Sequence, residues 1–133
     1  NPFVLKAVGE EIAGMVTFDV VAGVAVGGVP IAVATSLASK KPYAIIRAGE
    51  KSHGKAGRII GKVTGMRVLL VEDVTTSGGS VIRGIQALRA EGALVDTVVT
   101  VVDREAGAPD ALLKLGVRLA ALSRASEIVG DPE

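Results

Sequence analysis

Two adjacent carboxylates and a run of hydroxyl residues and glycines make up the most reactive stretch of this sequence. Glu72 and Asp73 follow the apolar run Val68–Val71, and a predicted helix begins after them. Between the carboxylates and that helix lie small polar residues and glycines: Thr75, Thr76, Ser77, Gly78, Gly79 and Ser80. A helix N-terminus offers unpaired N–H groups and partial positive charge, and glycines let an anion approach the backbone. The run predicts a cradle for one phosphate group, and the carboxylates could hold hydroxyls or a divalent cation.

A basic segment precedes this run in the sequence. Residues 47–58 include three glycines and no apolar period, so we expect an exposed, mobile loop. Its cationic or imidazole side chains are Arg47, Lys51, His53, Lys55 and Arg58. Cations that approach a leaving group as it gains negative charge stabilise the transition state more than the ground state. A solvated connector is the alternative interpretation of this segment.

Two further segments follow predicted strands. The turn at Gly27 and Gly28 lies between an apolar run and Pro30, and its backbone N–H groups could bind an anion. Asp103-Arg104-Glu105 follows another apolar run, and an arginine can bind a carboxylate through two parallel hydrogen bonds. The alternatives are an ordinary tight turn and a surface salt-bridge triplet.

Strands alternate with helices along the chain. Strands are predicted at 20–26, 43–46, 68–71, 95–102 and 117–122, with a possible short one at 59–63; helices are predicted at 5–16, 31–37, 82–90 and 110–115. This order predicts an α/β fold with a mainly parallel sheet of about five strands and helices on both faces. Because ligands of such sheets bind beyond the carboxyl ends of the strands, the polar segments should meet at one edge. We expect a single domain, residues 1–133.

Composition excludes several other classes. The net charge is +1, so no strong field draws the chain to nucleic acid or a membrane, and neither is an expected partner. The absence of cysteine excludes disulfides and thiolate metal sites and permits a cytoplasmic location, which we expect. No apolar run reaches the ~20 residues of a membrane span, and the first residues do not form a signal peptide.

Other phosphate-binding motifs fit less well. Gly61-Lys62-Val63 lacks the hydroxyl residue that follows lysine in a Walker A loop, and no dinucleotide-binding glycine pattern is present. A polar helix N-cap that satisfies only its own backbone is the remaining alternative for residues 75–80. The paired acids directly after an apolar strand make that alternative much weaker.

The segment Val68–Ser80 resembles the phosphoribosyl pyrophosphate signature of type I phosphoribosyltransferases, especially the orotate phosphoribosyltransferase form. The resemblance extends from about Leu5 to Ile128. It implies the type I phosphoribosyltransferase fold. It also implies that Glu72 and Asp73 bind the ribose hydroxyls and that residues 75–80 bind the 5′-phosphate.

The basic segment resembles the mobile loop of these enzymes, which has the pattern Arg-Lys-x-x-Lys-x-His-Gly. Arg47, Lys51, His53 and Gly54 match this pattern, whereas Ala48 replaces the second residue, a lysine. The resemblance implies that loop 47–58 closes over pyrophosphate in the neighbouring subunit of a homodimer. Lys51, His53 and Asp73 are then the candidate catalytic residues.

The same resemblance assigns the remaining site residues. Val26, Gly27 and Gly28 correspond to a pyrophosphate loop that binds through its backbone, and Thr76 and Arg104 would bind orotate. No residue is expected to bind a metal directly, because Mg²⁺ would be held through substrate oxygens.

The expected reaction joins orotate to phosphoribosyl pyrophosphate, giving orotidine 5′-monophosphate and pyrophosphate in pyrimidine synthesis. The family normally carries an N-terminal segment with a lysine and aromatic residues over the base, and nothing ahead of Leu5 corresponds to it. We therefore expect a truncated core or an unusually short relative. Three alternatives stay open: transfer to a purine base, a regulator that binds phosphoribosyl pyrophosphate or nucleotides without catalysis, and an inactive core.

Overall fold

A mainly parallel six-stranded sheet forms the centre of the molecule in the computed structural model, which describes residues 1–48 and 58–129. The strand order is β3-β2-β1-β4-β5-β6. Only β3 is antiparallel to its neighbour, β2. The strands are Val20–Val24 (β1), Tyr43–Ile46 (β2), Ile59–Ile60 (β3), Val68–Thr75 (β4), Thr97–Asp103 (β5) and Arg118–Arg124 (β6). The predicted fold class is confirmed, and the two-residue edge strand β3 makes the sheet one strand larger than the five expected.

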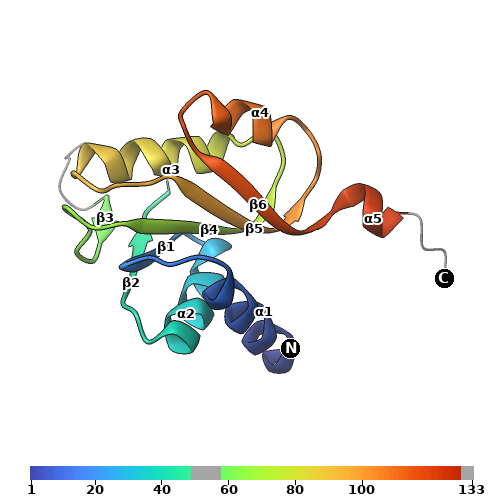
Figure 1. Cartoon of the computed structure of the whole chain (residues 1–133), viewed down its shortest axis with the longest axis horizontal. Coiled ribbons are helices and arrows are strands. Elements are labelled where there is room, and N and C mark those ends of the chain that lie inside the picture. The colour runs from blue at the N-terminus through green and yellow to red at the C-terminus, as the bar shows by residue number, and fades with distance from the viewer. Residues whose placement is uncertain (49–57, 130–133) are drawn as a thin grey trace.

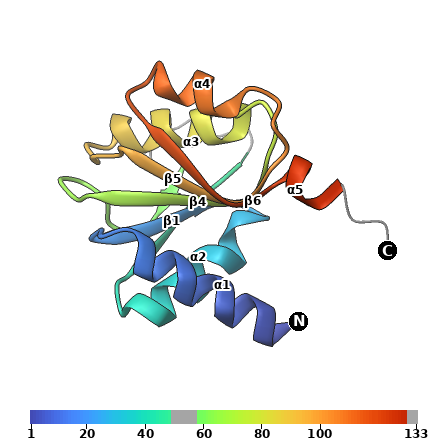
Figure 2. The ribbon, with the colours of Figure 1, turned by 45° about the vertical axis from the view of Figure 1, so that its right-hand side comes forward.

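Helices cover both faces of this sheet. They are Pro2–Met15 (α1), Gly28–Ser39 (α2), Gly79–Ala90 (α3), Ala108–Leu113 (α4) and Ala125–Val129 (α5). In Figures 1 and 2, α1 and α2 lie on one face, α3 and α4 lie on the other, and α5 extends beyond the end of β6. Four of the helices were predicted, but α5 was missed because five residues are too few to show a helical period. No helix within the described ranges is long and apolar enough to cross a membrane.

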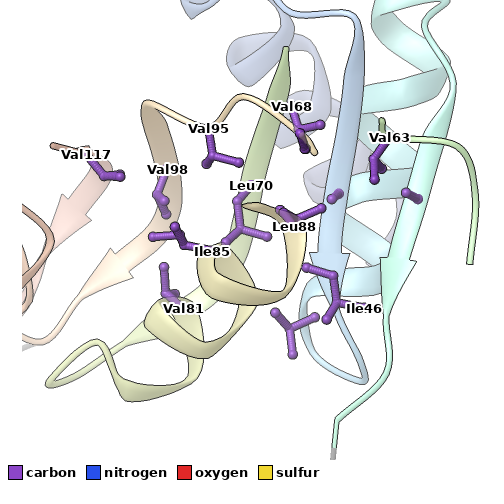
Figure 3. Packing of buried hydrophobic residues seen from close by; sticks show 14 of the residues in the cluster. Ile46, Val63, Val68, Leu70, Val81, Ile85, Leu88, Val95, Val98 and Val117 are labelled. Carbon is purple, nitrogen blue, oxygen red and sulfur yellow. The ribbon is translucent and has the colours of Figure 1, made fainter. Parts of the chain in front are cut away.

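Alternation along the strands divides the core into two layers. Leu70 and Val98 face α3 and α4, where they pack with Ile85 and Leu88 (Figure 3). The adjacent strand residues Leu69, Val71 and Val99 instead pack toward α1 and α2, with Ile12 and Ile31. Because side chains alternate along a strand, one apolar run supplies both layers, as parallel sheets that are buried on two faces require.

The first helical layer depends on a close crossing of α1 and α2. A Cβ atom at Gly9 would lie 2.5 Å from both the carbonyl carbon and the carbonyl oxygen of Ala34. These are backbone atoms that cannot rotate away. Gly14 lies in the same helix, and a Cβ atom there would have no neighbour within 4 Å.

These two glycines form a matched pair for a stability test. Gly9→Ala should lower the free energy of unfolding by about 1–3 kcal/mol, because the two helices must separate. Gly14→Ala should raise it by up to about 1 kcal/mol, because alanine favours the helix and meets no obstacle. Urea unfolding of both variants measures the difference. Equal responses would contradict the close crossing.

Candidate functional site

Four polar segments meet at the carboxyl edge of the sheet. They lie at or just beyond the carboxyl ends of the parallel strands β1, β2, β4 and β5, so they start side by side. The Ala25 N–H donates to the Ile46 carbonyl at 2.9 Å, and the Arg104 N–H donates to the Thr75 carbonyl at 2.8 Å. These bonds join the segments pairwise. The predicted meeting of the candidate segments at one edge is therefore observed for their described residues.

The centre of this edge is a topological switch point. β1 and β4 are neighbours, but the helices that follow them, α2 and α3, cover opposite faces of the sheet (Figure 2). The two connecting loops therefore diverge from each other. A crevice of this kind is where open α/β sheets bind ligands.

The two carboxylates lie within β4 rather than after it. The predicted end of this strand at Val71 is wrong, because β4 continues to Thr75 and pairs Glu72 with Thr100 of β5. Side chains alternate along a strand, so neighbouring acids have different surroundings. Glu72 is only 7% exposed, whereas Asp73 is exposed to solvent.

Glu72 holds its proton more tightly than an ordinary glutamate side chain does. Its Oε1 accepts a hydrogen bond from the Asp73 N–H at 3.1 Å, and the Ser80 hydroxyl donates to its Oε2 at 3.5 Å. Burial raises the pKa of Glu72 to about 7, and the neighbouring Asp73 side chain adds to that rise. Near neutral pH this carboxyl group therefore changes readily between its charged and neutral forms.

The loop after β1 packs directly against these carboxylates. A Cβ atom at Gly27 would lie 2.6 Å from Oδ2 of Asp73. One at Gly28 would lie 2.9 Å from the carbonyl oxygen of Val71. At Gly28 the close atom is backbone and cannot move aside, so glycine is needed there, whereas at Gly27 a larger residue would displace the Asp73 carboxylate. Val26 precedes them in a cis peptide bond with Ala25, and its side chain is exposed.

The run after β4 forms the N-terminus of α3. Gly78 has φ +97°, a left-handed conformation that favours glycine, and no side chain of the described residues caps the first turn. Thr75 is 2% exposed, and its hydroxyl has no hydrogen-bond partner among the described residues. Unpaired N–H groups and a buried hydroxyl together favour an anion here. The remaining predicted members of this run are Thr76, Ser77 and Ser80, which are exposed, and Gly79, which is half-buried.

The segment after β5 carries the candidate arginine. The Arg104 side chain is exposed, and its backbone is held to Thr75. The buried Asp103 accepts the Glu105 N–H at 2.9 Å, so its carboxylate fixes the turn and forms no ion pair with Arg104 within the described part of the chain. The structure therefore gives no support to a salt-bridge triplet.

The two ends of the basic segment meet at the same edge. The Arg47 N–H donates to the Arg58 carbonyl at 2.8 Å, and the Arg47 side chain is exposed. Lys51 and His53 lie outside the described residues, so their predicted roles stay predictions.

A partly apolar hollow of about 710 Å³ also adjoins the site, and sequence reasoning missed it. Asp73 and Val74 line it on the sheet side. In the sequence, the single apolar residue Val74 between polar neighbours was the one feature that could have indicated this hollow. Its other lining residues are Asn1, Pro2, Val4, Leu5, Val8, Ile31, Val101 and Val102. A second hollow, of about 550 Å³, is lined by Phe18, Arg67 and Leu94 among others and lies away from these loops.

Comparisons with known proteins agree on one family. Residues 7–115 match the phosphoribosyl transferase domain. Orotate phosphoribosyltransferase from Methanoculleus marisnigri is 64% identical over 97% of this chain and 76% of its own length. The crystal structure of Mycobacterium tuberculosis orotate phosphoribosyltransferase in complex with 5-phospho-α-D-ribosyl 1-diphosphate has a TM-score of 0.83 at 30% identity. That match covers 96% of this chain and 77% of the other. The Aeropyrum pernix orotate phosphoribosyltransferase structure also has a TM-score of 0.83, at 33% identity over 97% of this chain and 74% of the other.

Proposed function

The chain belongs to the phosphoribosyltransferase family, and on that premise we propose that it transfers the 5-phosphoribosyl group from phosphoribosyl pyrophosphate to orotate. The products are orotidine 5′-monophosphate and pyrophosphate, a step of pyrimidine synthesis. One observation carries the proposal: the β4 carboxylates lie between a glycine loop and the uncapped N-terminus of α3. This arrangement supports a binding site for a sugar diol between two binding sites for phosphate groups.

The sugar end is assigned to β4 and the start of α3. Glu72 and Asp73 bind the ribose hydroxyls, because carboxylate oxygens accept hydrogen bonds from a diol. Residues 75–80 bind the 5′-phosphate through backbone N–H groups and hydroxyls. The buried, unpartnered hydroxyl of Thr75 supports this assignment, since a phosphate oxygen would accept its hydrogen bond.

The pyrophosphate end is assigned to the β1 loop and the basic segment. Val26, Gly27 and Gly28 bind pyrophosphate oxygens through their backbone N–H groups. Arg47, Lys51 and His53 supply positive charge as the bond to ribose C1 breaks. Closure of loop 47–58 would exclude water, which could otherwise hydrolyse the activated sugar. This closure acts on the neighbouring subunit of a homodimer.

The site residues fit a magnesium ion that is bound mainly by substrate. The described residues hold no group of three or more His, Asp or Glu side chains that could bind a metal. Mg²⁺ is typically held by one or two carboxylates, waters and substrate phosphates. Asp73 is exposed beside the pyrophosphate loop, where it would bind the ribose hydroxyls that help to hold the ion. When bound, the ion would neutralise charge on pyrophosphate and ribose oxygens.

The chain's own residues act on a dissociative transfer that needs no covalent nucleophile. The ribose gains positive charge as pyrophosphate leaves, and the Asp73 carboxylate stabilises that charge. Lys51 and His53 stabilise the departing oxygens, and His53 can also protonate them. Thr76 and Arg104 hold the acceptor, with the Arg104 guanidinium on the orotate carboxylate.

The cysteine-free sequence fits a cytoplasmic location.

Turnover of four bases by the same preparation tests the function. The chain is incubated with phosphoribosyl pyrophosphate and Mg²⁺ and offered orotate, adenine, hypoxanthine or xanthine. We expect pyrophosphate release when orotate is the base and none with the three purines. Release with a purine and none with orotate would replace the acceptor. If calorimetry shows binding of phosphoribosyl pyrophosphate but no base is turned over, the chain is a regulator. If there is neither binding nor turnover, it is an inactive core.

A further inference from the structure

A side-chain contact joins the acceptor segment to the last helix. The Glu105 carboxylate accepts hydrogen bonds from the Ser126 N–H at 2.9 Å and from the Ser126 hydroxyl at 3.1 Å. The two residues are 21 positions apart. Ser126 belongs to α5, the helix that projects past the end of β6 (Figure 1). The contact therefore ties a helix at the edge of the fold to the residue that follows Arg104.

The backbone at Glu105 is held in an uncommon conformation. Its φ is +61°, in the left-handed region that a residue with a Cβ atom rarely adopts. Its N–H donates to the buried carboxylate of Asp103, and the preceding N–H, that of Arg104, donates to Thr75. Strained residues of this kind persist where the surroundings determine them and cluster at functional sites.

Glu105 also caps the first turn of α5. It accepts the N–H of Ser126, the second residue of the helix, whereas Glu127 accepts the N–H of Arg124, which precedes the helix, at 3.0 Å. Glu105 reaches the helix from another loop, so its contact fixes that loop as much as it fixes the helix. The backbone of Arg104 and the side chain of Glu105 are both held by hydrogen bonds. The Arg104 side chain, which lies between these two fixed points, is exposed.

We propose that Glu105 and Ser126 form a positioning pair that aims the Arg104 guanidinium at the carboxylate of the acceptor base. The inference rests on the proposed function, because Arg104 is assigned to that carboxylate there. Without the pair, residues 104 and 105 can relax to an ordinary backbone conformation. The guanidinium fork then loses its alignment, although its charge and the sugar-phosphate site stay in place.

Kinetics of three variants test the pair. Glu105→Ala should raise the KM for orotate about tenfold and Ser126→Ala about threefold, since they remove two hydrogen bonds and one. The KM for phosphoribosyl pyrophosphate should stay within about twofold, because the assigned sugar site is untouched. Glu105→Gln should behave like the parent chain: its amide oxygen can accept the Ser126 N–H and its NH₂ can donate to the hydroxyl. In an Arg104→Ala background, Glu105→Ala should change nothing further.

Amide hydrogen exchange separates this inference from the proposed function. Exchange at the Arg104 and Glu105 N–H groups should become about tenfold faster in Glu105→Ala and stay unchanged in Glu105→Gln. Faster exchange without any effect on the KM for orotate would overturn the aiming of Arg104 by the pair, whereas parent-like kinetics of Arg104→Ala would reject Arg104 as the acceptor residue. Three other results would overturn the positioning pair. They are unchanged amide exchange in Glu105→Ala, equal rises in KM for both substrates, and a Glu105→Gln variant as impaired as Glu105→Ala.

Discussion

Replacing Asp73 by asparagine is expected to lower kcat/KM for phosphoribosyl pyrophosphate by about 10²–10³-fold. Asparagine keeps the shape, and its amide oxygen can still accept the Val74 N–H, as Oδ1 of Asp73 does at 2.8 Å. What it removes is the negative charge facing the ribose as that sugar becomes cationic. Because this charge matters most in the transition state, kcat should fall with kcat/KM. Steady-state kinetics at saturating orotate provide the measurement.

A matched variant controls for the general loss of one negative charge. Asp96 is also exposed, but it lies next to the start of β5, at the opposite edge of the sheet. Asp96→Asn should leave both kinetic constants unchanged. Asp73→Asn should remain folded at the assay temperature, since its side chain is exposed. Parent-like kinetics of Asp73→Asn would remove this residue from the catalytic assignment.

Replacing Arg104 by alanine should lower kcat/KM for orotate by about 10²–10³-fold, because the acceptor carboxylate loses a paired set of charge-assisted hydrogen bonds. Arg104→Lys should recover only part of the loss, since an ammonium group keeps the charge but cannot form the two parallel bonds. The affinity for phosphoribosyl pyrophosphate, measured by calorimetry, should not change.

Arg118→Ala is the corresponding control for Arg104. Arg118 is exposed at the start of β6, at the opposite edge of the sheet, so its removal changes net charge without touching the site. Its kinetics should match those of the parent chain. If Arg104→Ala and Arg118→Ala behave alike, Arg104 does not bind the acceptor and base selection must come from elsewhere.

Sequence patterns predicted the candidate site residues but placed the end of β4 too early. The apolar run ends at Val71, so the polar residues after it were interpreted as a loop. In the structure the ladder with β5 continues, pairing Glu72 with Thr100 and Thr75 with Asp103. Pairing with a neighbouring strand overrides weak local propensity. The different burial of Glu72 and Asp73 follows from that continuation and could not be predicted without it.

Contacts between distant segments were the other part that the sequence could not supply. The glycines at 27 and 28 predicted a tight turn, but nothing local indicates that Gly27 lies against the Asp73 carboxylate. Helix α5 was missed, and with it the contact of Glu105 with Ser126. The common edge of the candidate segments was predicted because strand order and parallel direction follow from alternating elements.

The buried acid on β4 makes the stability of the fold depend on pH. The pKa of Glu72 rises from 4.5 to about 7 on folding, so the folded chain holds this proton more tightly than the unfolded chain does. Its contribution to folding is full below about pH 4.5 and is lost as pH rises through about 7. At neutral pH the ionised carboxylate therefore destabilises the fold at this position. A ligand whose hydroxyls solvate the ionised carboxylate would relieve that destabilisation, so occupancy and folding would reinforce each other.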